Sequence, residues 1–571
     1  IDSLYYLLWK YAWCAPSAAY ESEPDISLFD HLKTTAAIAT CLQESNEDKF
    51  LLVGGDISGI QNFIYKLTSP EESQKGMAQR LRGRSFYLSV MVETLVHYTI
   101  NKLNLPIMNI LWCGGGHFTI LAPNTREVKD RIEDCESKIN GWLYNKFQGE
   151  LCLILVNIPI DGAAGLINFG DSLQKLNVEI SKRKKRKFFK VKKERKFKLL
   201  GAVCPVCGND FKKGADEDRI CPDCKHHERI GERLPYIEYL VEIKSDKKLD
   251  ADIEFEEFSI YWKLERDVSK EVLPNSVIYR INNTDFISLN VQNKNVSYGF
   301  KFFGNLVAKD ENDNILTFEN MQKSNEGAKF LGILRMDVDN LGAVFNIGLG
   351  KDKSISRVAT ISRTLDLFFS GYLNEICKKY KTLYITYSGG DDLFIVGGWE
   401  EITEVAKEIS NEFKGYCCNN LGMHISGGIF ICKHKFPIGR AANLAGEKLN
   451  AKAKKIENKN AISIFEKAIY WDVFDEILEL SEKMIYEIKQ KNLSRGFVYG
   501  LLELYQKHIR EDKEELVWLP KFLYSLARNV KKQDEKGNLN LVFMEIKNKI
   551  PKLSKQIPIL VSYVSLRTRR E

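Results

Sequence analysis

The sequence predicts a mixed α/β (α+β) protein of several domains, and three observations lead to this prediction. The chain has 571 residues, too many for one hydrophobic core. One strand-helix-hairpin pattern occurs twice along it. Four cysteines between the two copies predict a small metal-binding segment. With 44% apolar and 28% charged residues, the composition is that of a folded globular protein rather than a disordered or fibrous one.

The sequence does not predict a membrane protein. No apolar run reaches the ~18 residues that a membrane-spanning helix needs. The first residues do not form a basic stretch followed by an apolar one, as a signal peptide would. We therefore expect a cytoplasmic protein that does not bind membranes. The chain begins with Ile1 rather than Met, which suggests that it has been truncated or trimmed upstream.

The first copy of the repeated pattern begins with a buried-strand run over residues 50–55 that ends at Asp56. A helix is expected around residues 85–103. Residues 111–120 then predict a hairpin with a glycine-rich turn. This order of elements is the pattern that the second copy repeats.

A dense basic run follows the first copy. Residues 182–198 contain twelve basic side chains and one acidic one, in a chain whose formal net charge is +7. Such a run can neutralise the phosphates of a nucleic acid, but a solvated loop can have the same composition. Both interpretations stay open, with nucleic-acid binding slightly favoured.

Four of the thirteen cysteines form two CxxC pairs with the spacing of a zinc ribbon. Each pair spans a turn that can bring two thiolates to one tetrahedral ion, and four protein ligands leave no open position for catalysis. Disulfides are not expected in the cytosol. Redox dithiols, or His226 or His227 in place of one sulfur, are less favoured. The predicted zinc ligands are Cys204, Cys207, Cys221 and Cys224.

The second copy shows the pattern more clearly. A buried-strand run over residues 330–336 ends at Asp337, and an amphipathic helix is expected to begin near Ser354. Two β-rich runs within residues 383–396 then predict a hairpin. Its turn carries Ser388, Gly389, Gly390, Asp391 and Asp392.

The carboxylates of this copy predict a site for divalent cations. Asp391 and Asp392 are adjacent and Asp337 comes from the neighbouring strand, so their charges repel one another unless cations lie between them. Oxygen ligands, including the carbonyl of Val338, suit Mg²⁺ or Mn²⁺. Two such ions lower the pKa of an attacking 3′-hydroxyl and neutralise a leaving pyrophosphate. We therefore predict Asp337, Asp391 and Asp392 as catalytic metal ligands for nucleotidyl transfer.

Glycines and lysines near the carboxylates are candidates for nucleotide binding, because glycine lets the backbone approach a phosphate. Residues 441–455 predict a helix that ends in lysines, whose ammonium groups can meet phosphate or simply face solvent. The predicted nucleotide-binding residues are Ser388, Gly389, Gly390, Val338, Lys452 and Lys454, with Gly114 and Gly115 from the first copy.

The two copies differ at the turn. When they are aligned on their glycines, Gly116 and His117 stand where the second copy has Asp391 and Asp392. Having lost two of three carboxylates, the first copy should not hold two metal ions. It can still contribute a binding surface.

The whole set of motifs is more specific than any one of them. A GGDD hairpin resembles the palm of GGDEF-type cyclases and family B-like polymerases. The ordered motifs GDISGIQNFIY (55–65), LRGRSFYL (81–88), the four cysteines and SGGDDLF (388–394) resemble the large signature subunit of type III-A CRISPR effector complexes. This similarity covers almost all of the chain.

The resemblance implies an architecture of two ferredoxin-like palm (cyclase) domains, a linker domain with the zinc ribbon, and a helical C-terminal domain. The domains expected from it are a helical remnant of an HD-type domain (1–48), a first, degenerate palm (49–199), the linker (200–325), a second palm with the GGDD motif (326–465) and the C-terminal domain (466–571).

The resemblance also implies a function. In that family two ATP molecules bind between the palms, and the second palm makes cyclic oligoadenylates once target RNA is bound. The implied partners are ATP, the guide and target RNAs, and the other subunits of the effector complex, for which this subunit is a scaffold.

One departure from the family concerns its N-terminal HD-type nuclease, which acts on single-stranded DNA. Its metal ligands include an adjacent His-Asp pair, and no His-Asp dipeptide occurs in this chain. Residues 25–33 resemble only the closing helix of that domain. DNA cleavage is therefore expected to be absent.

Two other functions stay open from the sequence. One is a scaffold that binds nucleotide without turning it over. The other is a diguanylate cyclase or a template-copying polymerase.

Overall fold

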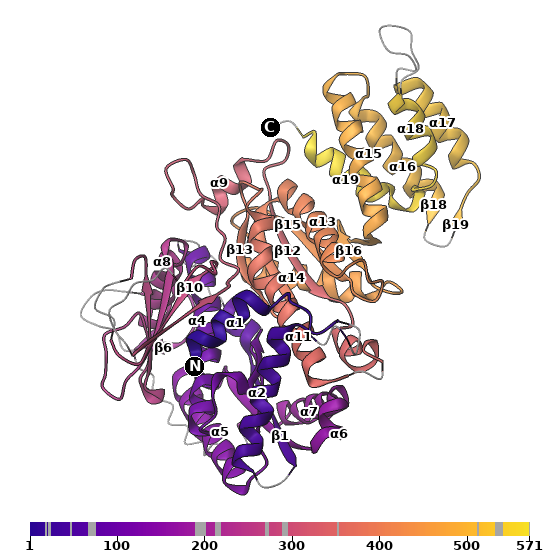
Figure 1. The fold of residues 1–571 in the computed structure, drawn as a ribbon. Helices are drawn as coiled ribbons and strands as arrows, with labels where there is room; N and C mark the ends of the chain where they lie inside the picture. The colour runs from indigo at the N-terminus through magenta and orange to yellow at the C-terminus, as the bar shows by residue number, and fades with distance from the viewer. Residues whose placement is uncertain are drawn as a thin grey trace.

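The structure is a computed structural model that describes residues 1–17, 20, 24–45, 48–66, 76–188, 201–211, 219–268, 273–287, 295–350, 353–510, 513–530 and 541–569. Its elements are grouped around three larger sheets and a helical C-terminal part (Figure 1). The mixed α/β class predicted from the sequence is confirmed.

Two helices precede the first sheet. They are α1 (Asp2–Ala12) and α2 (Leu28–Glu44). The α2 helix begins after Ser27, whose hydroxyl oxygen accepts a hydrogen bond from the backbone N–H of Asp30. Its buried face packs on the first copy through Ala37 and Cys41.

The first copy has a four-stranded antiparallel sheet with the order β2-β3-β1-β4. Its strands are β1 (Lys49–Ser58), β2 (Ile110–Gly114), β3 (His117–Pro123) and β4 (Cys152–Asp161). Its helices are α3 (Ile60–Tyr65), α4 (Met77–Lys102), α5 (Arg126–Phe147), α6 (Gly162–Ile167) and α7 (Phe169–Lys184), with the short η1 (Ile107–Asn109) before β2.

The second copy repeats this order as β13-β14-β12-β15 and extends it with β16 and β17. Its strands are β12 (Leu331–Val338), β13 (Tyr384–Gly389), β14 (Asp392–Gly398), β15 (Ile425–Cys432), β16 (Ala461–Ile464) and β17 (Lys467–Tyr470). Its helical segments are α10 (Leu341–Ala343), η4 (Val344–Gly348), α11 (Ile355–Leu367), η5 (Phe368–Tyr372), α12 (Leu373–Cys377), α13 (Trp399–Tyr416), α14 (Ile438–Ala451) and η6 (Ala453–Lys455). The sheet therefore continues to Tyr470, past the expected domain end at 465.

A third sheet, with the order β11-β10-β7-β9-β8, lies in the linker and was not foreseen in the sequence. Its strands are β7 (Tyr239–Lys244), β8 (Ile253–Phe255), β9 (Ile260–Glu265), β10 (Ser276–Ile281) and β11 (Val296–Lys301). The other linker elements are β5 (Ala202–Val203), β6 (Asp210–Phe211), α8 (Pro222–Arg233), η2 (Leu234–Tyr236), η3 (Glu256–Phe258) and α9 (Phe318–Lys323).

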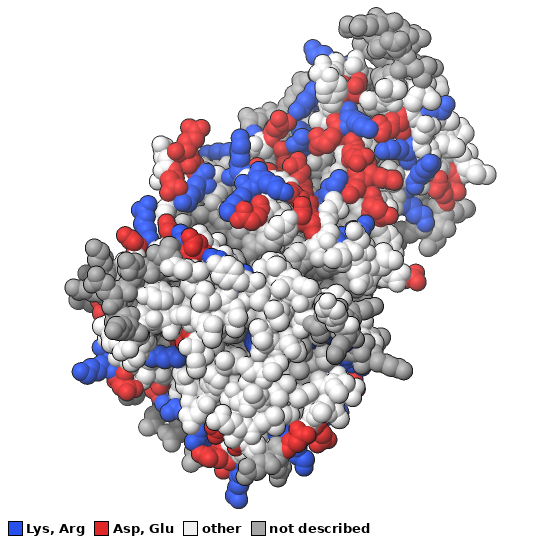
Figure 2. Space-filling view, in the orientation of Figure 1, with Lys and Arg blue, Asp and Glu red and all other residues white. Residues whose placement is uncertain are grey.

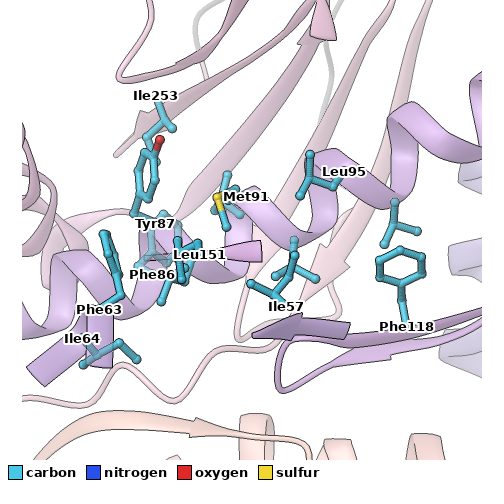
Figure 3. Close-up of a cluster of buried hydrophobic side chains, with 14 of the residues drawn as sticks. Ile57, Phe63, Ile64, Phe86, Tyr87, Met91, Leu95, Phe118, Leu151 and Ile253 are labelled. Atoms are coloured by element: carbon cyan, nitrogen blue, oxygen red, sulfur yellow. The ribbon is translucent and has the colours of Figure 1, made fainter. Parts of the chain in front are cut away.

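The α4 helix is the centre of the largest core. Of its 26 residues, 20 are buried, so it is covered on all sides rather than on one face. Figure 3 shows Met91 and Leu95 of this helix near Ile57 and Phe118 of the first sheet, and Ile253 of the linker sheet lies beyond the helix. The helix thus joins the first copy to the linker through apolar contact.

Close contact between α4 and α8 explains the LRGRSFYL motif. A Cβ atom on Gly83 would lie 1.7 Å from the carbonyl oxygen of His227, and one on Gly231 would lie 1.8 Å from that of Gln79. Only glycine fits at such a crossing. Arg82 donates to the carbonyl of Gly231 at 2.7 Å. The motif therefore docks the cysteine segment on the first copy.

The C-terminal part is helical. Its elements are α15 (Trp471–Lys489), α16 (Arg495–His508), α17 (Trp518–Asn529), α18 (Leu541–Lys549), η7 (Ser554–Gln556) and α19 (Ile557–Arg567), with the small ladder of β18 (Ile509–Arg510) and β19 (Lys513–Glu514). Tyr563 of α19 packs edge-on against Trp399 with ring centroids 5.4 Å apart. This contact ties the last helix to the second copy.

Charged side chains are unevenly spread on the face seen in Figure 2. Lys, Arg, Asp and Glu gather over the second copy and the C-terminal helices, and few lie over the first copy and α1 and α2. In the described part of the chain, no helix combines the length and the apolar character needed to cross a bilayer.

Candidate active site

The predicted carboxylates lie at adjoining strand ends of the second sheet. Asp337 of β12 pairs with Asp392 of β14 on one side and with Ser426 of β15 on the other. Directly opposed residues of antiparallel strands have Cα atoms about 4.5–5.5 Å apart. The backbone N–H of Val338 donates to the carbonyl of Asp391 at 3.0 Å. The hairpin thus brings Asp391 and Asp392 beside Asp337.

The local fold explains this placement. Gly389 pairs with Asp392, which leaves a two-residue turn of Gly390 and Asp391. Gly390 has a φ of 69°, a left-handed conformation that favours glycine. The turn therefore presents the two carboxylates at the edge where β12 ends.

Burial and, second to it, repulsion between the carboxylates disfavour the ionised forms of Asp391 and Asp392. Burial and the nearby charge of Asp391 raise the pKa of Asp392 to about 7, although Arg335 opposes the shift. Burial and the charge of Asp337 raise the pKa of Asp391 in the same direction. Both carboxyl groups are therefore costly to ionise without added positive charge.

Two basic side chains reach the carboxylates. Arg335 lies 3.6 Å from Asp392. Lys454 of η6 forms an ion pair with Asp337 and lies 3.3 Å from the carbonyl oxygen of Val338. Lys452, the other lysine named from the sequence, instead pairs with Glu466.

The donor set of this site is one that Mg²⁺ or Mn²⁺ accepts, namely carboxylates and a carbonyl. The side chains do not yet form a closed cluster, however. Within the described ranges, Asp337, Asp391 and Asp392 are not among the groups whose ligand atoms lie within 4.8 Å of one another. The ammonium group of Lys454 contacts two of the predicted metal ligands, the carboxylate of Asp337 and the carbonyl of Val338. Metal binding therefore requires this lysine to move.

The first copy has an equivalent constellation. Asp56 pairs with His117 across β1 and β3, as Asp337 pairs with Asp392. The sequence alignment of the two turns is therefore correct. The imidazole Nδ1 of His117 lies 2.5 Å from Asp56, and the ammonium group of Lys184 lies 2.6 Å from the same carboxylate oxygen. Burial alone would raise the pKa of Asp56, but these two groups lower it below its usual value.

The two hairpin turns face each other. A Cβ atom on Gly115 would lie 3.7 Å from the Cα atom of Gly390. A cavity of about 240 Å³ adjoins the turns and is lined by residues of both copies, among them Gly114, Gly115, Tyr387, Ser388 and Gly389. Predicted residues of the two copies therefore share one cavity wall. The hydroxyl of Ser388 is engaged by the fold, because it donates to the carbonyl of Phe369 at 2.5 Å.

Asp366 is a site residue that sequence reasoning missed. It lies on α11 and lines the same cavity. Its carboxylate accepts a hydrogen bond of 3.4 Å from the backbone N–H of Gly390 and would lie 3.1 Å from a Cβ atom on Gly114. Burial raises the pKa of this carboxyl group to about 6. It stands beside both turns, but no motif marks it in the sequence.

The four cysteines of the linker form a compact cluster. Their sulfur atoms all lie within 4.8 Å of one another and are buried. The sulfurs of Cys207 and Cys221 are 3.7 Å apart. Four Zn–S bonds of about 2.3 Å in a tetrahedron place sulfurs about 3.8 Å apart. Cys204, Cys207, Cys221 and Cys224 therefore fit a zinc ion.

Neighbouring groups support the cysteine cluster. The backbone N–H of Cys221 and the guanidinium of Arg84 donate to the sulfurs of Cys204 and Cys224, each at 3.3 Å. His226 lies 2.6 Å from the carbonyl of Asp252, and His227 packs on Phe63 and Tyr87. Both histidines are thus engaged elsewhere.

The first three residues of the basic run form ion pairs with acidic side chains of the fold. Lys182 pairs with Glu179, Arg183 with Glu136 and Lys184 with Asp56. Residues 189–198 lie outside the described residues. The interpretation of the run as a nucleic-acid-binding segment stays a prediction.

The chain is similar to known proteins in both copies and over most of its length. Residues 49–201 match the family described as Csm1 subunit domain B, and residues 330–463 match the Cas10/Cmr2 second palm domain. The chain is 30% identical to the CRISPR system single-strand-specific deoxyribonuclease Cas10/Csm1 (subtype III-A) of Methanocaldococcus jannaschii, over 88% of this chain and 74% of that relative.

Solved structures share the fold. A Csm1-Csm4 cassette in complex with cA4 is 22% identical, with a TM-score of 0.78 over 100% of this chain and 78% of that chain. A Csm1-Csm4 cassette in complex with one ATP is 23% identical, with a TM-score of 0.75 over 95% of this chain and 75% of that chain. By sequence and by fold, this chain belongs to the Cas10/Csm1 family, the large subunits of type III-A CRISPR effector complexes.

Proposed function

We propose that this protein joins ATP molecules into cyclic oligoadenylates at the second palm when target RNA is bound to its effector complex. The observation that carries the proposal is the pairing of Asp337 with Asp392 beside a turn that faces the glycine turn of the first copy. A cavity next to both turns supports binding of nucleotides between the copies.

The chemistry follows from the donor set. The 3′-hydroxyl of one nucleotide attacks the α-phosphorus of another, a P–O bond forms, the proton passes to solvent, and pyrophosphate leaves. Bound Mg²⁺ or Mn²⁺ would activate the hydroxyl and neutralise the leaving group. Asp337, Asp391 and Asp392 would hold these ions, Gly389 and Gly390 would let phosphate approach the backbone, and Lys454 would move from Asp337 to phosphate.

The relatives support the partners we propose. Similar Csm1 chains are assembled with Csm4 and bind cA4 or ATP. We propose that this chain likewise acts in the cytoplasm with a Csm4-type subunit, guide RNA and target RNA, and that zinc on the four cysteines is structural.

The relative from M. jannaschii is named as a single-strand-specific deoxyribonuclease. We propose that residues of this chain do not supply that activity. The lack of a His-Asp dipeptide supports this proposal.

The test uses the protein assembled with its partner subunits, guide RNA and complementary target RNA. With ATP and Mg²⁺ or Mn²⁺, mass spectrometry should find cyclic adenylate products, and Asp391→Ala with Asp392→Ala should abolish them while the complex still assembles. Removing carboxylates that repel one another should not destabilise the fold, so assembly is the matched readout.

Each other outcome would refute the proposal in a different way. Nucleotide binding without product would identify a scaffold. Cyclic dinucleotide from GTP would identify a diguanylate cyclase, and primer extension a polymerase. Product formation that survives the double substitution would refute the site assignment.

A further inference from the structure

Asp339 is a buried carboxylate near the predicted metal ligands that the proposed chemistry does not use. It follows β12, two residues after Asp337, and its side chain is 0% exposed. One of its oxygens, Oδ2, lies 2.8 Å from the imidazole Nδ1 of His424. The same oxygen accepts hydrogen bonds from the hydroxyl of Ser426 at 2.6 Å and from the backbone N–H of Asn460 at 3.1 Å. These three neighbours fix the orientation of the carboxylate.

The other oxygen of Asp339, Oδ1, lacks a donor. It is shielded from solvent and has no hydrogen-bond partner in the described part of the chain. The ammonium group of Lys454 lies 4.0 Å from it, which is too far for a hydrogen bond. Leaving a buried charged acceptor without a donor is unfavourable. The fold therefore directs an unsatisfied acceptor toward a lysine that is bound elsewhere.

Lys454 is bound at the predicted metal ligands. It pairs with Asp337 and lies 3.3 Å from the carbonyl oxygen of Val338. Its side chain is 17% exposed, so protein groups surround most of it. A shift of about 1 Å toward Oδ1 of Asp339 would bring the ammonium group within hydrogen-bond distance. A second acceptor is thus close to the lysine that must leave Asp337.

We propose that Asp339 accepts the ammonium group of Lys454 when a divalent cation binds at Asp337, and that it is thereby a positioning residue of the metal site. The proposal deepens the proposed function, on which it rests for the presence of the cation. A charge-assisted hydrogen bond to Oδ1 offsets the ion pair that Lys454 gives up. The lysine also stays beside the site, from which it can move to phosphate when a nucleotide binds.

The test measures Mn²⁺ binding to the full-length chain without nucleotide, by electron paramagnetic resonance. In Asp339→Asn, the three neighbours of Oδ2 keep the amide oxygen in its place, so the amide N–H groups face Lys454. Two donors then oppose each other, and the lysine stays on Asp337. We expect the Mn²⁺ affinity to fall by about tenfold, as for the loss of one charge-assisted hydrogen bond.

A double-mutant cycle separates this role from a general effect of charge. Asp339→Asn is also measured in the Lys454→Met background, where the long-range attraction between Asp339 and the cation is still lost. The weakening should be about tenfold greater with Lys454 present than in this background. An equal weakening in both backgrounds would identify Asp339 as a ligand or a distant charge and overturn the proposal. A greater weakening in the Lys454→Met background would mean that the lysine moves away from Asp339, and would overturn it as well.

The matched control is Glu466→Gln. Glu466 also pairs with a lysine of this region, Lys452, and its side chain is 73% exposed. Its substitution removes one negative charge without touching Asp337 or Asp339, and the Mn²⁺ affinity should stay unchanged. Circular dichroism of each variant shows whether the fold is retained.

A second measurement needs no substitution, and it decides the question if Asp339→Asn does not fold. A crystal structure of the parent chain with Mn²⁺ and no nucleotide should show the ammonium group of Lys454 within about 3.2 Å of Oδ1 of Asp339. An ammonium group that turns to solvent would overturn the proposal. Failure of the proposed function has a different signature, in which Mn²⁺ binds with the expected coupling but the assembled complex forms no cyclic product. Absence of Mn²⁺ from Asp337 would overturn the metal assignment and this proposal together.

Discussion

Replacing Asp392 by asparagine should stabilise the second palm in the absence of metal. The carboxyl group has a pKa of about 7 in the fold, against 3.8 when exposed. At 1.36 kcal/mol per pKa unit, its ionisation costs at most about 4 kcal/mol of stability. The raised pKa comes first from burial and then from the charge of Asp391. The side chain is 21% exposed, so water screens part of this cost, and we expect about 2 kcal/mol.

The sign of the pH dependence follows from the direction of the shift. Because the folded state holds the proton more tightly than the unfolded state, stability falls as pH rises from about 4 to about 7 and is constant above that range. The asparagine that replaces Asp392 does not titrate. The gain of Asp392→Asn over the parent should therefore be near zero at pH 4 and largest at pH 8.

The assay is thermal unfolding in EDTA over this pH range. A gain of about 2 kcal/mol corresponds to roughly 4–8 °C in the transition that includes the second palm. Asp313→Asn is the control, because this side chain is 68% exposed and pairs with Lys309. A Tm gain for Asp392→Asn that is absent at pH 8, or equal at pH 4 and pH 8, would refute the account in which burial and the charge of Asp391 disfavour ionisation of Asp392.

Two further predictions concern the cations of the protein. Lys454→Met should tighten Mn²⁺ binding in the absence of nucleotide by about tenfold, because it removes the ammonium group that pairs with Asp337. Lys452→Met is the control and should leave the Mn²⁺ affinity unchanged, since Lys452 pairs with Glu466. Electron paramagnetic resonance measures the bound Mn²⁺ in both variants. Cys221→Ser should lower the zinc content, measured by elemental analysis, from about one ion per chain to near zero. It should also expose α8 to protease, because binding of a structural zinc ion stabilises the fold of the segment that holds it. An unchanged zinc content would contradict the ligand assignment.

The proximity of Asp337 to Asp391 and Asp392 could be predicted from the sequence because the placement of these residues is local. A buried strand ending at Asp337 and a hairpin with Gly389 and Gly390 are patterns of short range, and adjoining strands bring their ends together. The four cysteines were equally readable, since CxxC spacing constrains the two knuckles. The end of the second sheet was harder to predict, because no sequence signal assigns β17 to this sheet.

The residues that were missed depend on long-range packing. Asp366 is one polar residue on an amphipathic helix, and only the docking of α11 brings it to Gly390. The ion pair of Lys184 with the buried Asp56 could not be predicted, because Lys184 lies in a basic run whose composition is that of a solvated loop. The linker sheet was missed because its short strands follow no repeat. In each case the tertiary partner, not the local sequence, determines the role.

The contact between the two turns is held in part by α2, which is bonded to both copies. Lys33 donates to the carbonyl of Leu111 in the first hairpin at 2.8 Å. Asp30, fully buried, pairs with Arg363 of α11 at 2.8 Å. Arg363 lies one helical turn before Asp366, which contacts Gly390. Because breaking a buried ion pair is strongly destabilising, we expect a displacement of α2 to move α11 as well, and the spacing of the two turns beside the cavity therefore depends on this helix.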